Sequence, residues 1–145
     1  MTADISHSAR AHTAAEARFR VPYRNSRDRS ASLIALDAAS ESIVEHAVAS
    51  LPGRRRCLPL AATPLPTTDL LVIVAHVGCN AEAAALLGEA CRLHNIAVTA
   101  LLIAPDGTAD DAMAHTLSQL RPFASMIVVA KDTDYIEDML RALRA

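Results

Sequence analysis

The stretch from residue 69 to residue 103 constrains the fold of this chain more than any other. Residues 70–75 (LLVIVA) are an unbroken apolar run of strand length, and residues 96–103 (IAVTALLI) are apolar apart from Thr99. Between them lie a short loop at residues 76–80 and an Ala- and Leu-rich helical segment at residues 81–94. Continuous apolar strands that flank a helix are typical of a parallel sheet covered on both faces. The stretch therefore predicts a β–α–β unit.

Strand and helix patterns alternate through the rest of the chain. We expect strands at residues 31–37 and 125–130, the latter as the last core strand, and a helix with Ser40 as its N-cap. Residues 57–60 form at best an edge strand, because Pro59 cannot donate to a ladder. Alternation of this kind implies right-handed crossovers. The sequence thus predicts an α/β fold, a single three-layer, doubly wound (Rossmann-like), mostly parallel sheet.

Residues 1–29 differ from residues 30–145, which we expect to form the α/β domain. Residues 1–29 include six arginines and three acidic residues, and they contain no long apolar run. This composition fits an Arg-rich tail that is partly disordered, or an arm that contacts a partner. Because the segment has no apolar core region, we expect no secretory signal peptide.

Composition argues against several classes of function. No apolar run approaches the ~20 residues of a membrane span, so we expect no membrane partner. A net charge of −2 and 3% aromatic residues give little support for nucleic-acid binding. Three irregularly spaced cysteines do not form a disulfide framework, which favours the reducing cytoplasm.

Ligands of open parallel sheets bind outside the carboxyl ends of the strands. That rule selects four loops, at residues 37–40, 76–80, 105–108 and 131–134. The candidate ligand-binding residues in these loops are Asp37, His76, Gly78, Cys79, Asn80, Asp106 and Lys131.

The loop at residues 76–80 has the most informative composition. Gly78 permits a turn with positive φ, and Asn80 is placed to cap the next helix, so the N–H groups of residues 81–83 could bind an anion or a phosphate. An ordinary strand-to-helix turn explains the same residues. Asp37 could contact a ribose hydroxyl or a metal, or simply cap a helix, and Lys131 could offset phosphate charge.

Cysteine and histidine pairs invite a zinc or a nucleophile hypothesis. His76 and Cys79 precede the predicted helix, whereas Cys91 and His94 lie on its last turn, roughly 15–20 Å away along the axis. Four ligands of one ion cannot converge across that distance, so we expect no metal. Cys79 near a helix start could act as a nucleophile with His76 as base. No third orienting residue is evident, so we assign no catalytic residue and no cofactor.

Residues 69–138 resemble the central part of the nucleotide-binding domain of the tubulin and FtsZ family. The resemblance lies in the order of an apolar strand, a loop with Gly78, an Ala-rich helix, a second strand, a helix, and a third strand leading to Asp132. It implies a nucleotide-binding fold. The family's glycine-rich phosphate loop stands here as HVGCNAEA, with one glycine, so no GTPase residue is carried over.

We therefore expect a small non-catalytic α/β domain that acts through protein–protein interaction or self-association, with a regulatory role as one form of this. The alternative is a binding module for an anionic small molecule or nucleotide at residues 76–80, and a third hypothesis is an enzyme that uses Cys79.

A homodimer is the expected form of self-association. The segment at residues 57–60 would leave a sheet edge open, and Leu60, Leu65 and Leu70 would add apolar surface beside it. An alternative is that the Arg-rich tail covers this edge and keeps the protein monomeric.

Overall fold

The computed structural model describes residues 28–61 and 67–145. Nearly all of the Arg-rich tail expected at residues 1–29 lies outside the described residues, as do residues 62–66. The predictions made for those segments therefore stay predictions.

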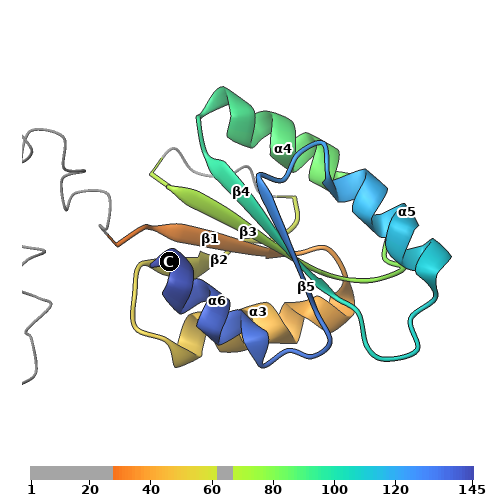
Figure 1. The fold of residues 1–145 in the computed structure, drawn as a ribbon. Coiled ribbons are helices and arrows are strands. Elements are labelled where there is room, and N and C mark those ends of the chain that lie inside the picture. The colour runs from red at the N-terminus through yellow and green to blue at the C-terminus, as the bar shows by residue number, and fades with distance from the viewer. Residues whose placement is uncertain (1–27, 62–66) are drawn as a thin grey trace, which may run out of the picture.

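Strands and helices alternate along the described chain except between β2 and β3, which have no described helix between them (Figure 1). In order they are β1 (Ala31–Ala35), α3 (Ala38–Ser50), β2 (Arg55–Cys57), β3 (Leu70–His76), α4 (Ala83–Leu93), β4 (Ala97–Ile103), α5 (Asp110–Leu120), β5 (Met126–Ala130) and α6 (Tyr135–Leu143). The five strands pair in parallel in the order β2-β1-β3-β4-β5. This is the flavodoxin-like order of doubly wound sheets, so the predicted fold class is confirmed.

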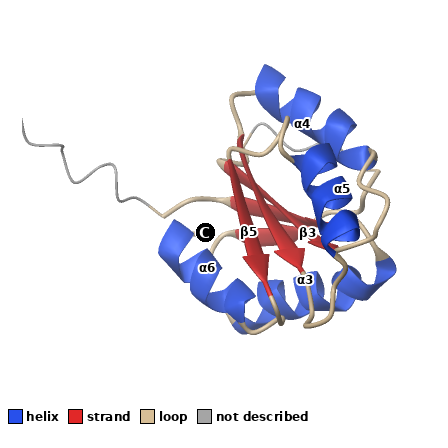
Figure 2. Cartoon of the chain, turned by 45° about the vertical axis from the view of Figure 1, so that its right-hand side comes forward, coloured by secondary structure: helices blue, strands red, loops and turns tan. Residues whose placement is uncertain are grey.

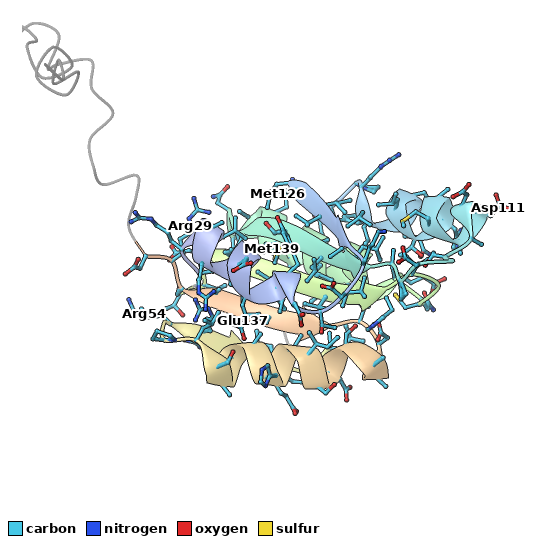
Figure 3. All side chains as sticks on the ribbon, turned by 60° about the horizontal axis from the view of Figure 1, so that its bottom comes forward. Arg29, Arg54, Asp111, Met126, Glu137 and Met139 are labelled. Carbon is cyan, nitrogen blue, oxygen red and sulfur yellow. The ribbon has the colours of Figure 1, made fainter. Side chains whose placement is uncertain are left out.

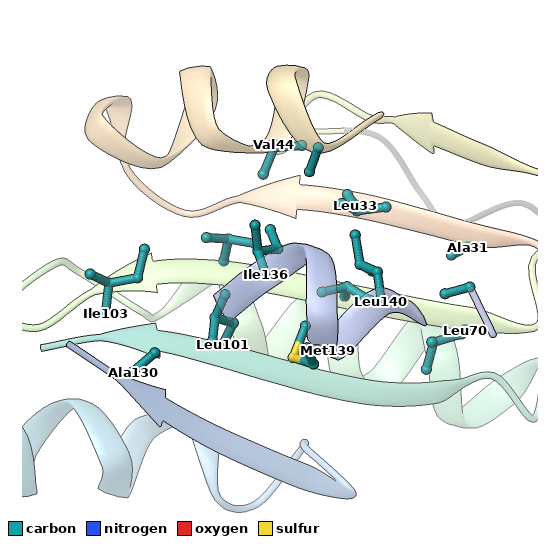
Figure 4. Close-up of a cluster of buried hydrophobic side chains, with 14 residues drawn as sticks. Ala31, Leu33, Val44, Leu70, Leu101, Ile103, Ala130, Ile136, Met139 and Leu140 are labelled. Atoms are coloured by element: carbon teal, nitrogen blue, oxygen red, sulfur yellow. The ribbon is translucent and has the colours of Figure 1, made fainter. Parts of the chain in front are cut away.

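The sheet lies between two layers of helices, with α3 and α6 on one face and α4 and α5 on the other (Figure 2). Successive strand residues point to opposite faces, so each strand supplies both cores. Along β3, Leu70, Val72 and Val74 pack with α3 and α6, whereas Leu71, Ile73 and Ala75 pack with α4 and α5. Figure 4 shows Leu33 and Leu101 of the first core facing Val44 and Ile136. Burial on both faces explains why the strands at residues 70–75 and 96–103 read as almost unbroken apolar runs.

The two edge strands differ from their predictions. β2 covers Arg55–Cys57 instead of residues 57–60, because Leu58 N–H donates the last ladder bond, to Leu33 O at 3.0 Å, and Pro59 has no N–H to continue it. β5 is an edge strand and not a core strand, since β4 is its single neighbour among the described strands. Met126 and Val129 are accordingly 39% and 48% exposed.

The apolar surface expected beside the β2 edge is smaller than predicted. Leu70 is buried, because it begins the central strand β3, so its assignment to this surface was wrong. Leu60 is 41% exposed, and Leu65 lies outside the described residues.

Two helices begin at positions other than those predicted. Asp37 is the N-cap of α3, which confirms the capping role considered for it, whereas the prediction of Ser40 as the cap is wrong. The Asp37 carboxylate accepts from the Ser40 N–H, and the helix starts at Ala38. α4 begins only at Ala83, after Glu82, so Asn80 is not its N-cap. Asn80 instead accepts from the Glu82 N–H at 3.0 Å, which forms a side-chain turn before the helix.

None of the described helices is both long enough and apolar enough to cross a membrane.

Candidate functional site

The four loops selected by the sequence all follow parallel strands and so meet at one edge of the sheet. Strand order reverses between β1 and β3, because α3 leaves β1 on one face and α4 leaves β3 on the other (Figures 1 and 2). Open α/β sheets place their ligand crevice at such a point. Asp37 and His76 come directly after and at the end of these two strands, so the fold brings them together.

One carboxylate, that of Asp37, ties the two loops to each other. Its Oδ1 accepts from the Ser40 N–H at 2.8 Å, and its Oδ2 accepts from the His76 N–H at 2.8 Å. The Ser40 hydroxyl donates to the same carboxylate at 2.9 Å. Burial pushes the pKa of Asp37 up, but these hydrogen bonds from His76 and Ser40 outweigh it, so the pKa lies below its ordinary value. The carboxylate is therefore charged and hydrogen-bonded at neutral pH.

The ring of His76 completes this cluster through one nitrogen only. Nδ1 lies 2.9 Å from Ser40 Oγ and 3.2 Å from Asp37 Oδ1. A carboxylate can only accept hydrogen bonds, so in the contact with Asp37 it is Nδ1 that donates. Within the part of the chain that the structure describes, no hydrogen bond reaches Nε2, and the side chain is 28% exposed.

These three residues do not form a hydrolytic triad. In a triad the acid and the nucleophile bind different nitrogens of the histidine ring, so that the ring can relay a proton. Here Asp37 and Ser40 share Nδ1, and Ser40 is completely buried. The cluster thus holds the ends of β1 and β3 together, and its chemistry is structural.

Two of the three N–H groups at residues 81–83 that would bind an anion are engaged, and so is the N–H of Gly78. Gly78 N–H donates to Thr116 Oγ1 at 3.1 Å, and Ala81 N–H donates to Gln119 Oε1 at 3.4 Å, both on α5. The Glu82 N–H is taken by Asn80. Gly78 has φ 88°, and a Cβ there would meet nothing within 4 Å, so the glycine serves the turn itself. The loop is hydrogen-bonded to α5, and these bonds fit an ordinary strand-to-helix turn.

The thiol of Cys79 is not activated. Burial raises its pKa, and the nearby Asp37 charge raises it further. A nucleophilic cysteine needs the opposite shift. Burial also raises the pKa of Cys91 to about 11, in line with its place in the core.

The four residues of the zinc hypothesis lie in two pairs at opposite ends of α4, as the sequence predicted. α4 runs without a break from Ala83 to Leu93, so it separates His76 and Cys79 from Cys91 and His94. Among the described residues, no group of three or more His, Cys, Asp or Glu side chains is arranged to hold a metal ion.

The last two predicted site residues, Asp106 and Lys131, form an ion pair. Lys131 Nζ lies 2.8 Å from Asp106 Oδ1, and both side chains are largely exposed. An exposed ion pair of this kind stabilises a fold by roughly 0–1 kcal/mol. No hydrogen bond or ion pair joins it to the Asp37 cluster in the described chain.

No family model matches this chain, and no curated protein matches it. Two solved structures have a similar shape. A response regulator from Colwellia psychrerythraea is 12% identical, and the match covers 81% of this chain and 98% of that one with a TM-score of 0.46. A pilus assembly-related protein from Burkholderia pseudomallei is 20% identical, over 79% and 88% of the two chains, also with a TM-score of 0.46. Likenesses this loose carry no argument about function, and the tubulin and FtsZ resemblance stays a prediction.

Proposed function

We propose that this chain is a small non-catalytic α/β domain that acts through protein contacts, and that it forms a homodimer through the outward face of α4. One observation carries the proposal. Leu86 and Leu93 are 80% and 68% exposed on that face. They are seven residues apart, which is about two helical turns, so both lie on one stripe of the helix. Two large leucines that are this exposed on one stripe mark an interaction surface.

A second copy of the chain fits this stripe. If two α4 helices pack antiparallel about a two-fold axis, Leu86 of each copy meets Leu93 of the other. Such a contact is self-complementary, as two-fold interfaces require. Glu89 and Arg92 beside the stripe form an ion pair at 2.7 Å, so the pair adds no net charge that would repel a second copy.

The site chemistry supports a non-catalytic role. Ser40 is buried, the pKa of the Cys79 thiol is raised, and the ring of His76 is engaged by two residues that share one nitrogen. The engaged N–H groups at residues 76–80 likewise favour a structural turn over the alternative of an anion or nucleotide module. Reversible pairing would suit a regulatory protein of the cytoplasm, where free cysteines stay reduced.

Light scattering and sedimentation over a series of concentrations test the dimer. We expect the full chain to shift from monomer to dimer mass in the micromolar range, because a single helix pair buries less surface than a standard interface. Leu86→Glu and Leu93→Glu should each hold the protein at monomer mass, since a charge would be buried in the contact.

Ala114→Glu is the matched control, because it adds the same charge at an exposed position on α5. It should dimerise like the unchanged protein. A monomer mass for the unchanged protein at every concentration would reject self-association through α4. A dimer that survives both leucine substitutions would move the contact to another surface, such as the β2 edge predicted from sequence.

A further inference from the structure

A hollow of about 290 Å³ opens at the amino end of the sheet, away from the candidate site. Its walls come from residues 28–29 before β1, residues 52–55 around the start of β2, and residues 141–145 at the end of α6. Backbone hydrogen bonds join these segments, from Arg29 N–H to Arg144 O and from Ala31 N–H to Arg54 O. Five arginines line the hollow: Arg29, Arg54, Arg55, Arg141 and Arg144. Figure 3 shows Arg29 and Arg54 at this end of the molecule.

Positive charge in this hollow exceeds negative charge. Asp28 is the one acidic side chain in the described lining, and a carboxylate at Ala145 would still leave more cations than anions. Arg141 is paired on α6, with Asp138 at 3.2 Å and Glu137 at 3.5 Å. In the ranges that the structure describes, no hydrogen bond or ion pair holds the side chain of Arg29 or Arg54.

Arg55 is fixed in place and incompletely satisfied. Its Nη1 donates to Pro52 O at 2.8 Å, and its Nη2 donates to Ala145 O. A Cβ on Gly53 would lie 3.0 Å from Nη1, so the guanidinium rests against the main chain of this turn. Its Nε is buried and has no acceptor among the described residues. Burial lowers the pKa of Arg55, and the charge of Arg141 lowers it further. A buried N–H without an acceptor is uncommon in folded proteins and costs stability.

We infer that this hollow is a binding site for a small oxyanion of the phosphate class. Guanidinium groups present paired N–H donors that match phosphate oxygens, and several converge here from three segments. The volume suits one or two phosphate groups, and no aromatic side chain lines the described hollow for a base to stack on. A bound oxyanion offsets the crowded charge and supplies acceptors. The site is independent of the α4 contact and of the loop at residues 76–80.

Calorimetric titration of the full chain with pyrophosphate, at ionic strength held constant with NaCl, tests the site. We expect Arg29→Gln/Arg54→Gln to weaken binding at least tenfold, about the effect of losing one good bidentate contact. Arg54 is exposed and Arg29 is partly exposed, and neither side chain makes a hydrogen bond or ion pair within the described residues, so we expect this variant to keep the fold. Arg54→Lys retains the charge but loses the paired N–H donors of the guanidinium group, so it should weaken binding severalfold.

Arg92→Gln/Arg121→Gln is the matched control, because it removes the same charge from exposed positions on α4 and after α5. It should change the affinity less than twofold. Equal losses in both double variants, or no binding of pyrophosphate up to about 10 mM, would overturn the site. Inorganic phosphate and glycerol phosphate distinguish the source. Binding of the ester with the same arginine dependence supports a phosphate carried on a larger molecule, and binding of inorganic species alone supports free phosphate.

Discussion

At the carboxyl end of the sheet, Asp37 accepts hydrogen bonds from Ser40 and His76, and Lys131 lies 2.8 Å from Asp106. At the amino end, five arginines line one hollow, and Arg55 keeps a buried Nε without an acceptor in the described chain. The general rule for open α/β sheets points to the carboxyl end as the ligand site. In this molecule the charged side chains Asp37, Asp106 and Lys131 at that end all have partners, and the excess of positive charge lies at the other end. Topology gives the place where a site can form, whereas the excess of positive charge is the basis of the oxyanion site that we propose.

The largest expected effect comes from removing the carboxylate that closes the carboxyl end. Asp37→Ala deletes the cap of α3 and leaves Ser40 and the His76 N–H without their acceptor. We expect a loss of about 3 kcal/mol in the free energy of unfolding, from a lost cap plus unsatisfied buried donors. Urea denaturation measures it. Asp106→Ala, which removes an exposed carboxylate, should change stability by less than about 1 kcal/mol. If the two substitutions cost the same, the carboxyl end is not closed in the way described.

Acid should remove part of the same stabilisation. Burial opposes ionisation of Asp37, but its hydrogen bonds win, so the pKa in the folded protein lies below the ordinary 3.8. The folded state therefore binds the proton less tightly than the unfolded state does. The stabilisation is complete above the ordinary pKa of the unfolded chain and is lost as the pH falls through the lower pKa of the folded state. Asp37→Asn removes this titration. The stability difference between the unchanged protein and Asp37→Asn should therefore be constant near neutral pH and shift in favour of the variant below pH 3.8. A difference that stays constant down to pH 2 contradicts the charged state assigned to Asp37.

A glycine substitution separates backbone strain from ligand contact in the loop at residues 76–80. Gly78→Ala should cost about 1 kcal/mol, the price of a left-handed backbone for an L-residue. No atom crowds the new methyl group, because nothing lies within 4 Å of a Cβ there. Gly107→Ala is matched, since Gly107 also has φ 88° and open space around it. Thermal unfolding of both variants should show similar losses. A much larger loss for Gly78→Ala would mean that the loop has a further role.

The smallest effect has the opposite sign and belongs to the amino end. Arg54→Gln should raise stability by a few tenths of a kcal/mol at low ionic strength, because it relieves repulsion among like charges. The gain should vanish in about 0.5 M NaCl, where such charges are screened. Arg92→Gln, which breaks an ion pair with Glu89, should instead lower stability slightly. A loss with Arg54→Gln at low salt would show that the crowding is already compensated within the protein.

The central strands of the sheet could be predicted from the sequence, whereas the nature of its edge strands could not. The apolar runs at residues 70–75 and 96–103 predict the central strands because burial on both faces leaves few polar positions, here only Thr99. The edges were less predictable, since the edge strand β5 is as apolar in sequence as a central strand. Met126 and Val129 read as core residues although they lie on an exposed edge.

The candidate site was predicted in position but not in chemistry. Asp37 and His76 were both selected, and the rule for switch points places them together. Ser40 was considered only as a cap, although the spacing of Asp37 and Ser40 is that of a cap and its third residue. The arginine hollow was missed entirely. Arg29 falls in the predicted tail, and nothing in the sequence shows that the end of α6 returns beside it and Arg54.

The three-residue strand β2 has a consequence for how the molecule opens. It pairs with β1 through residues Arg55 to Cys57 only, whereas β3 pairs with β4 along seven residues. Regions with few ladder bonds and exposed backbone open with free energies far below that of global unfolding. Amide hydrogens of β2 should therefore exchange with solvent long before those of β3 and β4. Arg55 belongs to this weakly held strand and Arg54 directly precedes it, so this wall of the hollow can open locally while the central sheet stays folded.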